Sequence, residues 1–374
     1  MPDVPAVTPT ATPAAARAPI ELVLDAARWA PSGDNTQPWR FERLDAHAAL
    51  LHGHDTREHC VYDLDGRPSQ IAIGALIETA AIAASAHGWR LEASRRPGPD
   101  ERPTYELRLT ADGAVLPDPL AAVIERRSVQ RRPFRRTALT AAQKQALQAS
   151  VGSGFAVRWI EGGARRAMAG LLFRSARLRL TTPEAWRVHR DIIDWGARFS
   201  EERVPDQALG ANPLVLPAMR FALADWKRVQ FANRFLAGTW MPRIELDLLP
   251  ALGCAAHFVI LAPAPALTVE ANVAAGRAMQ RFWLTATALG LQLQPEMTPL
   301  IFARYAREGR RFSQTPGAFE AAAAVATGFE RIAGADALAR GVFVGRVGLG
   351  AQARSRSLRR RLETLFVSSP DTHR

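Results

Sequence analysis

The sequence has few of the residues that build disulfide frameworks or zinc sites. Only two cysteines, Cys60 and Cys254, occur in 374 residues, and they are too far apart for either arrangement. We therefore expect two buried free thiols, which fits a reducing cytoplasm. The eight histidines show no metal-ligand spacing, and the chain has no Gly-rich phosphate loop and no Gly-x-Ser-x-Gly nucleophile turn. We expect no metal site.

Long apolar runs and lysine are also scarce. No run of about 18 uncharged apolar residues occurs, so we expect no membrane span and no membrane partner. Residues 1–18 are rich in Ala, Pro and Thr, lack the pattern of a secretory signal, and are predicted to be a disordered tail. Lys144 and Lys227 are the only lysines among 48 basic residues, and the net charge is +12. Because no nucleic-acid-binding motif accompanies this charge, we expect no specific nucleic-acid partner, and we expect some arginines to hold a phosphate-bearing cofactor.

Helical and strand-like segments alternate irregularly along the rest of the chain. Capping residues and hydrophobic spacing predict helices over 19–30, 69–87, 119–127, 141–149, 269–289 and 317–331, with a long helical region from Ala164. Strands are predicted over 89–95, 104–110, 155–160, 257–263, 291–295 and 342–347, and strand entry near Trp39.

The stretch 201–250 is predicted to be the least regular part of the chain. It contains five prolines and several aromatic residues. Because linkers rarely contain so many aromatics, we interpret it as a packed excursion or lid. Trp226, Phe231 and Trp240 either pack in the core or stack over a bound substrate.

Two blocks of the sequence, 70–93 and 272–295, resemble each other. Gly74 and Gly88 are fourteen residues apart, and so are Gly276 and Gly290. Each block is a predicted helix closed by glycine and followed by a strand. Such units are common, so coincidence is one interpretation. The other is that two related halves are fused in one chain.

The most specific motif is the segment 31–39, which reads Pro-Ser-Gly-Asp-Asn-Thr-Gln-Pro-Trp. A predicted helix here breaks into a polar turn, whose backbone N–H groups and short side chains can meet the edge of a planar heterocycle. A plain helix-to-strand turn is the alternative. The segment resembles the Pro-Ser-x-x-Asn-x-Gln-Pro-Trp signature of FMN-dependent nitroreductases. The resemblance implies that Ser32, Gly33 and Asn35 line the isoalloxazine ring.

A second motif lies in the segment 125–134, Glu-Arg-Arg-Ser-Val-Gln-Arg-Arg-Pro-Phe. It resembles the Arg-x-Ser-x-Arg/Lys segment with which nitroreductases hold the FMN phosphate and ribityl chain. The residues so implied are Arg126, Arg127 and Ser128. Guanidinium forks and a hydroxyl can together saturate a phosphate dianion. Gln130 departs from the pattern, and Arg131 or Arg132 can substitute for the missing base. A solvated basic run is the alternative.

The order of the two motifs is reversed relative to ordinary nitroreductases. In this respect the chain resembles the Acg-like branch, in which one chain imitates the nitroreductase dimer and carries one flavin site. The resemblance covers about 20–366. It implies an α+β fold, a nitroreductase-like mixed sheet flanked by helices, with two related halves in one pseudo-dimer. The halves would be 19–118 and 119–366, the second with the lid-like excursion 201–250, followed by a tail over 367–374.

Two further segments resemble parts of the same branch. In the family, the loop after the strand that ends near 295 presents a backbone N–H to flavin N5, which implies a role for Gln294, Pro295 and Glu296. Proline has no N–H, so Glu296 or the following residue is the better donor; an exposed loop acid is the alternative for Glu296. The Arg-rich end of the chain resembles a closing phosphate clamp, for which Arg356 and Arg359 are the candidates, and a solvated tail is the alternative.

These features together predict a cytoplasmic FMN-binding oxidoreductase that acts on a small organic acceptor, with NAD(P)H as the reductant. No catalytic acid or base is required, because the flavin carries the hydride chemistry. The oligomeric state would be a monomeric pseudo-dimer or a higher homo-oligomer. The alternatives are an FMN-sequestering or sensing protein without NAD(P)H turnover, and a specialised enzyme of flavin breakdown or biosynthetic dehydrogenation.

Overall fold

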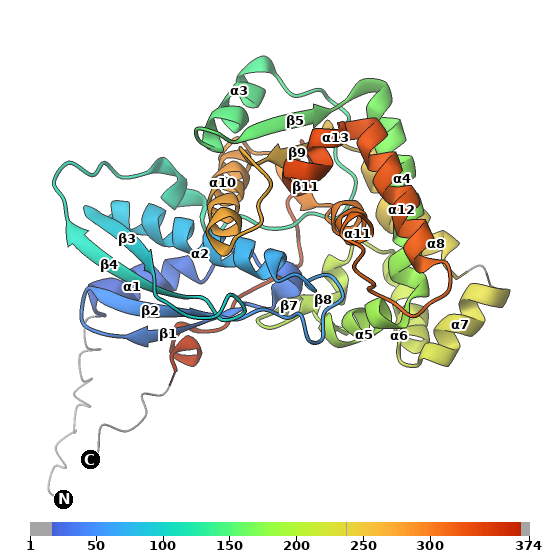
Figure 1. Cartoon of the computed structure of the whole chain (residues 1–374), viewed down its shortest axis with the longest axis horizontal. Helices are drawn as coiled ribbons and strands as arrows, with labels where there is room; N and C mark the ends of the chain where they lie inside the picture. Colours follow the sequence, from blue (N-terminus) through green and yellow to red (C-terminus); the bar gives the residue numbers. More distant parts are fainter. Residues whose placement is uncertain (1–16, 237, 368–374) are drawn as a thin grey trace, which may run out of the picture.

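The computed structural model describes residues 17–236 and 238–367 of the chain and has a mixed α+β architecture (Figure 1). The predicted tails, 1–18 and 367–374, lie outside the described residues except for Arg17, Ala18 and Val367. Both cysteines are buried and free, as expected. Within the described part, no helix is long and apolar enough to cross a membrane.

Four antiparallel strands form the first sheet, in the order β1-β2-β4-β3. They are β1 (Trp39–Arg43), β2 (Ala48–Gly53), β3 (Trp89–Arg95) and β4 (Thr104–Ala111). The helix α2 (Arg67–Ser85) connects β2 to β3, and α1 (Pro19–Ala27) packs against α2. Nearly every residue of α2 is buried, because helices and a sheet surround it.

The second sheet repeats this arrangement. Its strands are β5 (Ala156–Ile160), β9 (Ala256–Leu261), β10 (Gln292–Pro295) and β11 (Gly341–Gly348). They are again antiparallel, and their order, β5-β9-β11-β10, matches that of the first sheet strand for strand. The helix α10 (Val269–Ala288) connects β9 to β10 as α2 connects β2 to β3, and α3 (Ala141–Ser150) packs on α10.

The two connecting helices cross in the middle of the molecule, where Figure 1 shows α2 beside α10. The crossing is possible because both contact positions are glycine. A Cβ on Gly74 would lie 2.0 Å from the Val273 carbonyl oxygen, and a Cβ on Gly276 would lie 2.0 Å from the Ile71 carbonyl oxygen. Each glycine thus contacts the residue three positions before the other glycine. This reciprocity is what a two-fold axis produces.

Polar contacts along the crossing are reciprocal as well. The Gln280 amide donates to the Thr79 hydroxyl at 2.9 Å, and Arg281 donates to Glu78 at 2.9 Å. When Gly74 is aligned with Gly276, Glu78 aligns with Gln280 and Thr79 aligns with Arg281. The two hydrogen bonds therefore join equivalent positions of the two helices.

Two groups of helices lie between strands of the second sheet and have no counterpart between the described strands of the first. Between β5 and β9 lie α4 (Gly162–Thr181), α5 (Pro183–Ile192), α6 (Leu216–Leu223), α7 (Trp226–Phe235), α8 (Trp240–Pro242), the π-helix Arg243–Leu248, α9 (Leu249–Leu252) and the short strands β6 (Ile193–Asp194), β7 (Phe199–Ser200) and β8 (Val204–Pro205). Between β10 and β11 lie α11 (Thr298–Arg307), α12 (Ala318–Ala333) and α13 (Ala335–Arg340). These helices enclose a second apolar core beside the one around α2 and α10.

Most predicted helices and strands occur within two residues of their expected ends, but two expectations were wrong. The segment 119–127 is not a helix that carries Arg126 and Arg127; a 3-10 helix ends at Val123, and both arginines follow it. The stretch 201–250 is largely helical rather than irregular.

Two further segments add single bridges to the edges of the two sheets. Val129 forms a parallel bridge with Leu293 in β10, and Phe366 forms one with Phe41 in β1. Before it reaches β1, the C-terminal segment forms β12 (Arg356–Ser357), which pairs with β7, and the 3-10 helix Leu362–Leu365. These segments bring residues near 30, 127 and 359 to one place.

Candidate functional site

The segment 31–39 forms a strained turn. It contains the 3-10 helix Gly33–Asn35, and three residues that are not glycine have left-handed backbones: Asp34 at φ 50°, Asn35 at φ 62° and Gln37 at φ 49°. Asp and Asn tolerate this region, whereas a residue such as Gln adopts it at a cost of about 1–2 kcal/mol. Such strain persists only where surrounding contacts hold the backbone.

Buried amide side chains supply those contacts. Gln37 is fully buried; its amide nitrogen donates to the Glu201 carbonyl at 2.8 Å, and its amide oxygen accepts from the Arg360 N–H at 2.9 Å. The Asn35 amide nitrogen donates to the carbonyls of Glu201 and Arg203 at 3.0 and 3.3 Å. The turn is thereby tied to the first residues of the excursion 201–250 and to the C-terminal segment.

Three arginines from distant parts of the sequence gather beside this turn. Arg359 donates to the Ala30 carbonyl at 2.9 Å and to the Asn35 amide oxygen at 2.8 Å. Arg127 donates to the Trp29 carbonyl at 2.9 Å, and the guanidinium of Arg356 lies 5.0 Å from the centre of the Trp29 ring.

The three guanidinium groups carry charge that the protein does not neutralise. Within 17–236 and 238–367, none of Arg127, Arg356 and Arg359 forms an ion pair with a carboxylate, and the Nε atoms of Arg127 and Arg356 are buried without a hydrogen-bond partner. Burial and the neighbouring Arg359 and Arg356 hold the pKa of Arg127 well below its usual range. Burial, Arg356 and Arg28 lower the pKa of Arg359 to about 9. Unpaired buried cations of this kind create a site for an anion.

The chain after Arg127 runs along the edge of the second sheet. The N–H of Gln130 donates to the Leu293 carbonyl at 3.2 Å, and the Arg346 guanidinium donates to the carbonyls of Arg131 and Arg132 at 2.7 and 3.1 Å. Arg131 also faces Asp34 of the turn: burial raises the pKa of Asp34, and the charge of Arg131 opposes that rise. The segment therefore connects the strained turn with the end of β10.

The end of β10 lies in a buried charged network. Arg346 donates to the Gln294 amide oxygen at 2.6 Å, and Glu296 accepts from or donates to His257 Nδ1 at 2.7 Å, according to which of the two carries the proton. Burial alone would lower the pKa of His257, but the Glu296 carboxylate and hydrogen bonds to Cys254 and Glu296 raise it to about 10. Arg346 and His257 are fully buried, so this network stabilises the position of the strand end.

The sequence-predicted residues fall into three groups. Asn35, Arg127, Arg356 and Arg359 lie together around the turn, with Ser32 beside them, where its hydroxyl accepts from the Gln37 N–H. Gln294, Pro295 and Glu296 lie at the β10 end; the Glu296 N–H already donates to the Val344 carbonyl at 2.8 Å, and its side chain is buried rather than exposed.

The third group, Arg126, Gly33 and Ser128, forms no side-chain hydrogen bond or ion pair with the other described residues of either place. Arg126 is exposed and its side chain forms no hydrogen bond or ion pair with the described residues. Gly33 is exposed, with open space where a Cβ would lie, and Ser128 is half-buried.

Sequence reasoning missed several residues of the site. The guanidinium of Arg127 lies 4.7 Å from the centre of the Trp283 ring, so two tryptophans, Trp29 and Trp283, flank the arginines. Outside the cluster, against the second apolar core, Tyr62 stacks on His189, and the hydroxyl and ring nitrogen are 3.0 Å apart. Burial and Arg179 lower the pKa of His189 to about 3, so its ring is neutral. Arg346 had a signal in the sequence, because it is the charged residue within the otherwise apolar strand 341–348.

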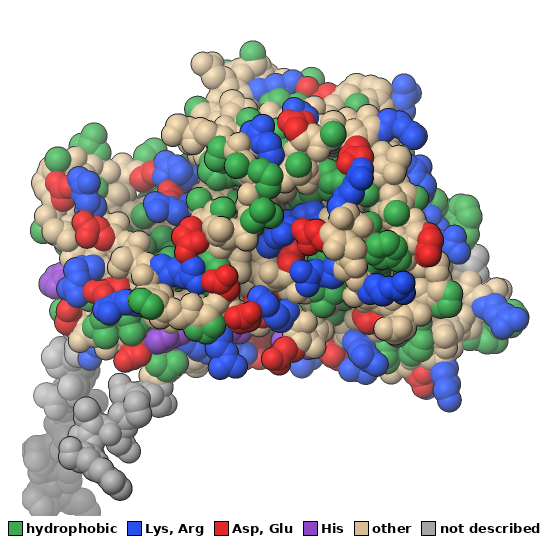
Figure 2. Space-filling model, viewed as in Figure 1, with side chains coloured by type: hydrophobic (Ala, Val, Ile, Leu, Met, Phe, Trp, Pro, Cys, Tyr) green, Lys and Arg blue, Asp and Glu red, His purple; other side chains and the backbone are tan. Residues whose placement is uncertain are grey.

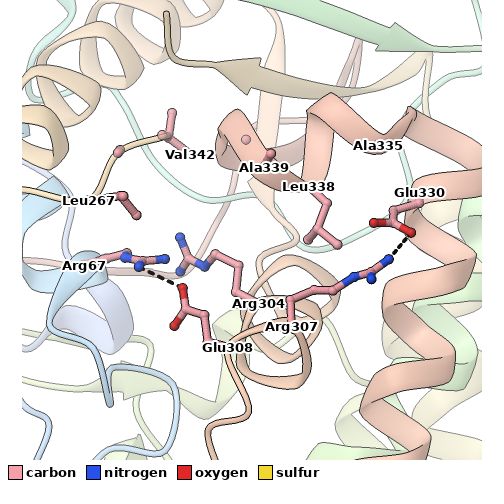
Figure 3. Close-up of a pocket in the computed structure, with 12 residues that line it drawn as sticks. Arg67, Leu267, Arg304, Arg307, Glu308, Glu330, Ala335, Leu338, Ala339 and Val342 are labelled. Carbon is pink, nitrogen blue, oxygen red and sulfur yellow. Dashed lines mark hydrogen bonds and ion pairs between the residues drawn. The ribbon is translucent and has the colours of Figure 1, made fainter. Parts of the chain in front are cut away.

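A separate cavity of about 320 Å³ lies between α11, α12, α13 and the start of α2 (Figure 3). Four of its charged side chains form two ion pairs, Arg67 with Glu308 at 2.8 Å and Arg307 with Glu330. The fifth, Arg304, has buried Nε and Nη2 atoms without a hydrogen-bond partner among the described residues, and its Nη2 lies 3.8 Å from Asp65. None of the sequence-predicted site residues lines it. Arg304 has Asp65 as a carboxylate neighbour, whereas neither Arg127 nor Arg359 has one within 17–236 and 238–367, so the cavity differs from the arginine cluster.

The fold and the cluster together define an α+β protein with a strained polar turn beside a buried, uncompensated anion site. The chain is 27% identical over 305 residues to candidate NAD(P)H nitroreductases from two strains of Mycobacterium tuberculosis, and the match covers 76% of this chain and 78% of each relative. A nitroreductase-like protein from Bacillus cereus aligns over 68% of this chain and 97% of its own, with 13% identity and a TM-score of 0.34. No family model matches the chain. The sequence similarity supports a distant relationship to nitroreductase-like oxidoreductases.

Proposed function

We propose that the chain is an FMN-dependent oxidoreductase that takes reducing equivalents from NAD(P)H and passes them to a small organic acceptor. The observation that carries this proposal is the cluster of the buried Arg127 and Arg359 with the half-buried Arg356, three guanidinium groups with no carboxylate ion pair in the described part of the chain. A phosphate dianion would supply the missing negative charge and hydrogen-bond acceptors. The relatives named as NAD(P)H nitroreductases support the reaction class.

The residues around the cluster fit the remainder of a flavin mononucleotide. The turn 31–39 borders the arginines and is held rigid by Asn35 and Gln37. A rigid turn can present polar groups to a heterocycle without losing conformational entropy on binding. When bound, the flavin would supply hydride chemistry, and the protein would bind it, orient it and exclude water.

The residues near the end of β10 would hold the backbone of this segment beside the flavin ring. The Glu296 N–H is engaged by the Val344 carbonyl, so we assign Glu296 a positioning role through His257 and Arg346 rather than direct donation to the flavin. The start of the excursion 201–250, which Asn35 and Gln37 hold, would cover the site.

We further propose that the two halves, 19–118 and 119–366, are related copies that build one site. The identical strand orders of the two sheets and the reciprocal contacts of α2 and α10 support this interpretation. If the two copies diverged and each kept a different part of one site, the turn would occur only in the first half, and Arg127 and Arg359 only in the second. One FMN per chain is the expected stoichiometry.

Two neighbouring arginines provide a matched test. Arg127→Gln removes a buried guanidinium from the cluster, whereas Arg126→Gln makes the same change at an exposed residue. Loss of one or two charge-assisted hydrogen bonds costs about 1.5–3 kcal/mol, so the Kd for FMN should rise about tenfold to a hundredfold in Arg127→Gln. Arg126→Gln should bind FMN as the wild type does. Titration of FMN fluorescence measures both, and thermal unfolding confirms that both variants are folded.

Failure of the wild-type protein to bind FMN would overturn the proposal, as would equal affinity of the two variants. Turnover is tested separately, by NAD(P)H oxidation with a quinone or a nitroarene. Bound FMN without NAD(P)H oxidation would favour the sequestering or sensing alternative, and bound FMN that is consumed would favour flavin breakdown.

A further inference from the structure

Exposed apolar side chains concentrate on the helices α6, α7 and α8. Of the fifteen large hydrophobic side chains exposed in the described part of the chain, eight lie between residues 214 and 241. They include Phe221, Phe231, Phe235, Leu236, Trp240 and Met241, each more than half exposed. Contiguous apolar surface of this kind marks an interaction site, because single scattered residues are the usual pattern.

The same helices are strongly basic. Arg220, Lys227, Arg228 and Arg234 lie on α6 and α7, and none of the four forms an ion pair with a described residue. The single acid of these two helices and their junction, Asp225, is occupied as the N-cap of α7, where it accepts from the backbone of Lys227 at 2.7 Å. Figure 1 places α6 and α7 at one end of the molecule, and Figure 2 shows basic and hydrophobic side chains next to each other at that end.

A groove of about 810 Å³ opens between α4, α7 and α8. Its charged lining residues are Arg177, Arg234 and Arg243, and no acidic residue lines it. Arg243 is 7% exposed; its Nε donates to the Phe173 carbonyl at 2.7 Å, and its guanidinium lies 3.8 Å from the centre of the Phe173 ring. The two terminal nitrogens form no hydrogen bond with the described residues. The groove therefore contains a buried cation with unused donors.

We propose that this face, formed by α6, α7, α8 and the groove, docks on an anionic phospholipid surface. The exposed aromatic and aliphatic side chains would enter the boundary between headgroups and acyl chains, and the basic residues would lie at the phosphate level, with a lipid phosphate in the groove at Arg243. The attachment is to the surface only and needs no membrane-spanning helix. It does not depend on FMN binding.

Charge argues for a lipid surface over a second copy of the chain. A symmetric dimer through this face would bring Arg220, Lys227, Arg228 and Arg234 toward the same residues of the other copy, and such like-charge contacts are unfavourable. An anionic bilayer instead attracts each of these residues, and Phe and Trp beside Arg are typical of helices that lie in the membrane interface.

Vesicle flotation with the full-length protein tests the proposal. The protein should float with vesicles made of equal parts phosphatidylglycerol and phosphatidylcholine, and should remain in solution with phosphatidylcholine alone. Each basic residue near an anionic surface is worth about fivefold in partitioning. The double variant Arg228→Gln/Arg234→Gln should therefore bind roughly twenty-five-fold more weakly, and Phe231→Ser/Phe235→Ser should lose at least about tenfold through lost apolar burial.

Two controls match these variants at other places. Leu116→Ser changes an exposed leucine that is 83% accessible on the first half, and Arg311→Gln changes an exposed arginine outside the face. Both should float as the wild type does. Equal flotation of the Phe231→Ser/Phe235→Ser variant, or equal binding to both vesicle types, would overturn the proposal. So would a dimer in solution that the same variant dissociates, or binding of soluble glycerol phosphate without any flotation.

Discussion

Replacing Gly276 by alanine adds one methyl group at the point where α2 and α10 cross. The new Cβ would lie 2.0 Å from the Ile71 carbonyl oxygen and 2.9 Å from the Gly74 Cα, both backbone atoms. An ordinary contact needs more than 3 Å, so the two helices must separate by about 1 Å. Because the neighbours are backbone atoms, no side-chain rotation can relieve the contact.

The energetic consequence can be worked from the same contacts. Overpacking costs about 1–3 kcal/mol. Separation of the helices would also weaken the hydrogen bonds Gln280–Thr79 and Asn272–Gln70, now 2.9 and 3.0 Å long, which are worth about 1 kcal/mol each. Alanine gains about 1 kcal/mol of helix propensity over glycine. The free energy of unfolding should therefore fall by about 2–4 kcal/mol.

Gly170→Ala is the matched control, because Gly170 lies within α4 and a Cβ there would meet only the flexible end of Arg174, at 3.5 Å. This variant should be more stable than the wild type, by up to about 1 kcal/mol, since it gains propensity without a clash. Urea unfolding followed by tryptophan fluorescence and circular dichroism measures both. If Gly276→Ala were as stable as Gly170→Ala, the close crossing of the two helices would be refuted.

Two further predictions concern the site. Asn35→Ala leaves Arg359 and the carbonyls of Glu201 and Arg203 without their shared partner. We therefore expect the free energy of unfolding to fall by about 2 kcal/mol and proteolytic cleavage within 201–250 to become faster. Unchanged cleavage would contradict the contact between the turn and the excursion. The pKa of His257 is about 10 in the folded protein, against an ordinary value of 6.5. Its charge therefore stabilises the fold fully below about pH 6.5, and this contribution disappears as the pH rises through 10. The stability difference between wild type and His257→Gln should therefore shrink from pH 6.5 to 10 in denaturant titrations, and a constant difference would argue against a charged His257.

Local sequence signals predicted most of the secondary structure because each is a short-range effect. Thr140 and Gln143 form the predicted capping box, and Gly88 and Gly290 end their helices with φ near 71° and 72°. The failures have tertiary or positional causes. The 119–127 helix stops early because Val129 must be extended to pair with Leu293.

The prolines of 201–250 misled the sequence reasoning for a different reason. Pro213, Pro217 and Pro250 each occupy one of the first two positions of a helical turn, where the missing N–H costs nothing. Pro213 and Pro217 lie where helical segments begin, and Pro250 lies where the π-helix Arg243–Leu248 continues into α9. Proline density alone therefore could not distinguish an irregular loop from a series of short helices.

The choice between Arg126 and Arg127 shows what a motif leaves open. Both match the Arg-x-Ser pattern or its neighbour, and the sequence treats them alike. In the structure both arginines follow a 3-10 helix that ends at Val123, and Arg127 turns inward to Trp29 and Trp283 while Arg126 is exposed. Only long-range packing decides this.

The C-terminal arginines show how the chain order and the site are connected. Arg359 reaches Ala30 and Asn35 because the last segment crosses to the first sheet, where Phe366 pairs with Phe41. Arg127 reaches Trp29 because the chain passes α10 on its way to β10. The arginines all belong to 119–366, whereas the carbonyls of Trp29 and Ala30 that Arg127 and Arg359 contact belong to 19–118, so the cluster and its hydrogen-bond partners come from both parts of the chain. An anion bound there would contact both halves at once, so ligand binding and the association of the halves should be thermodynamically linked.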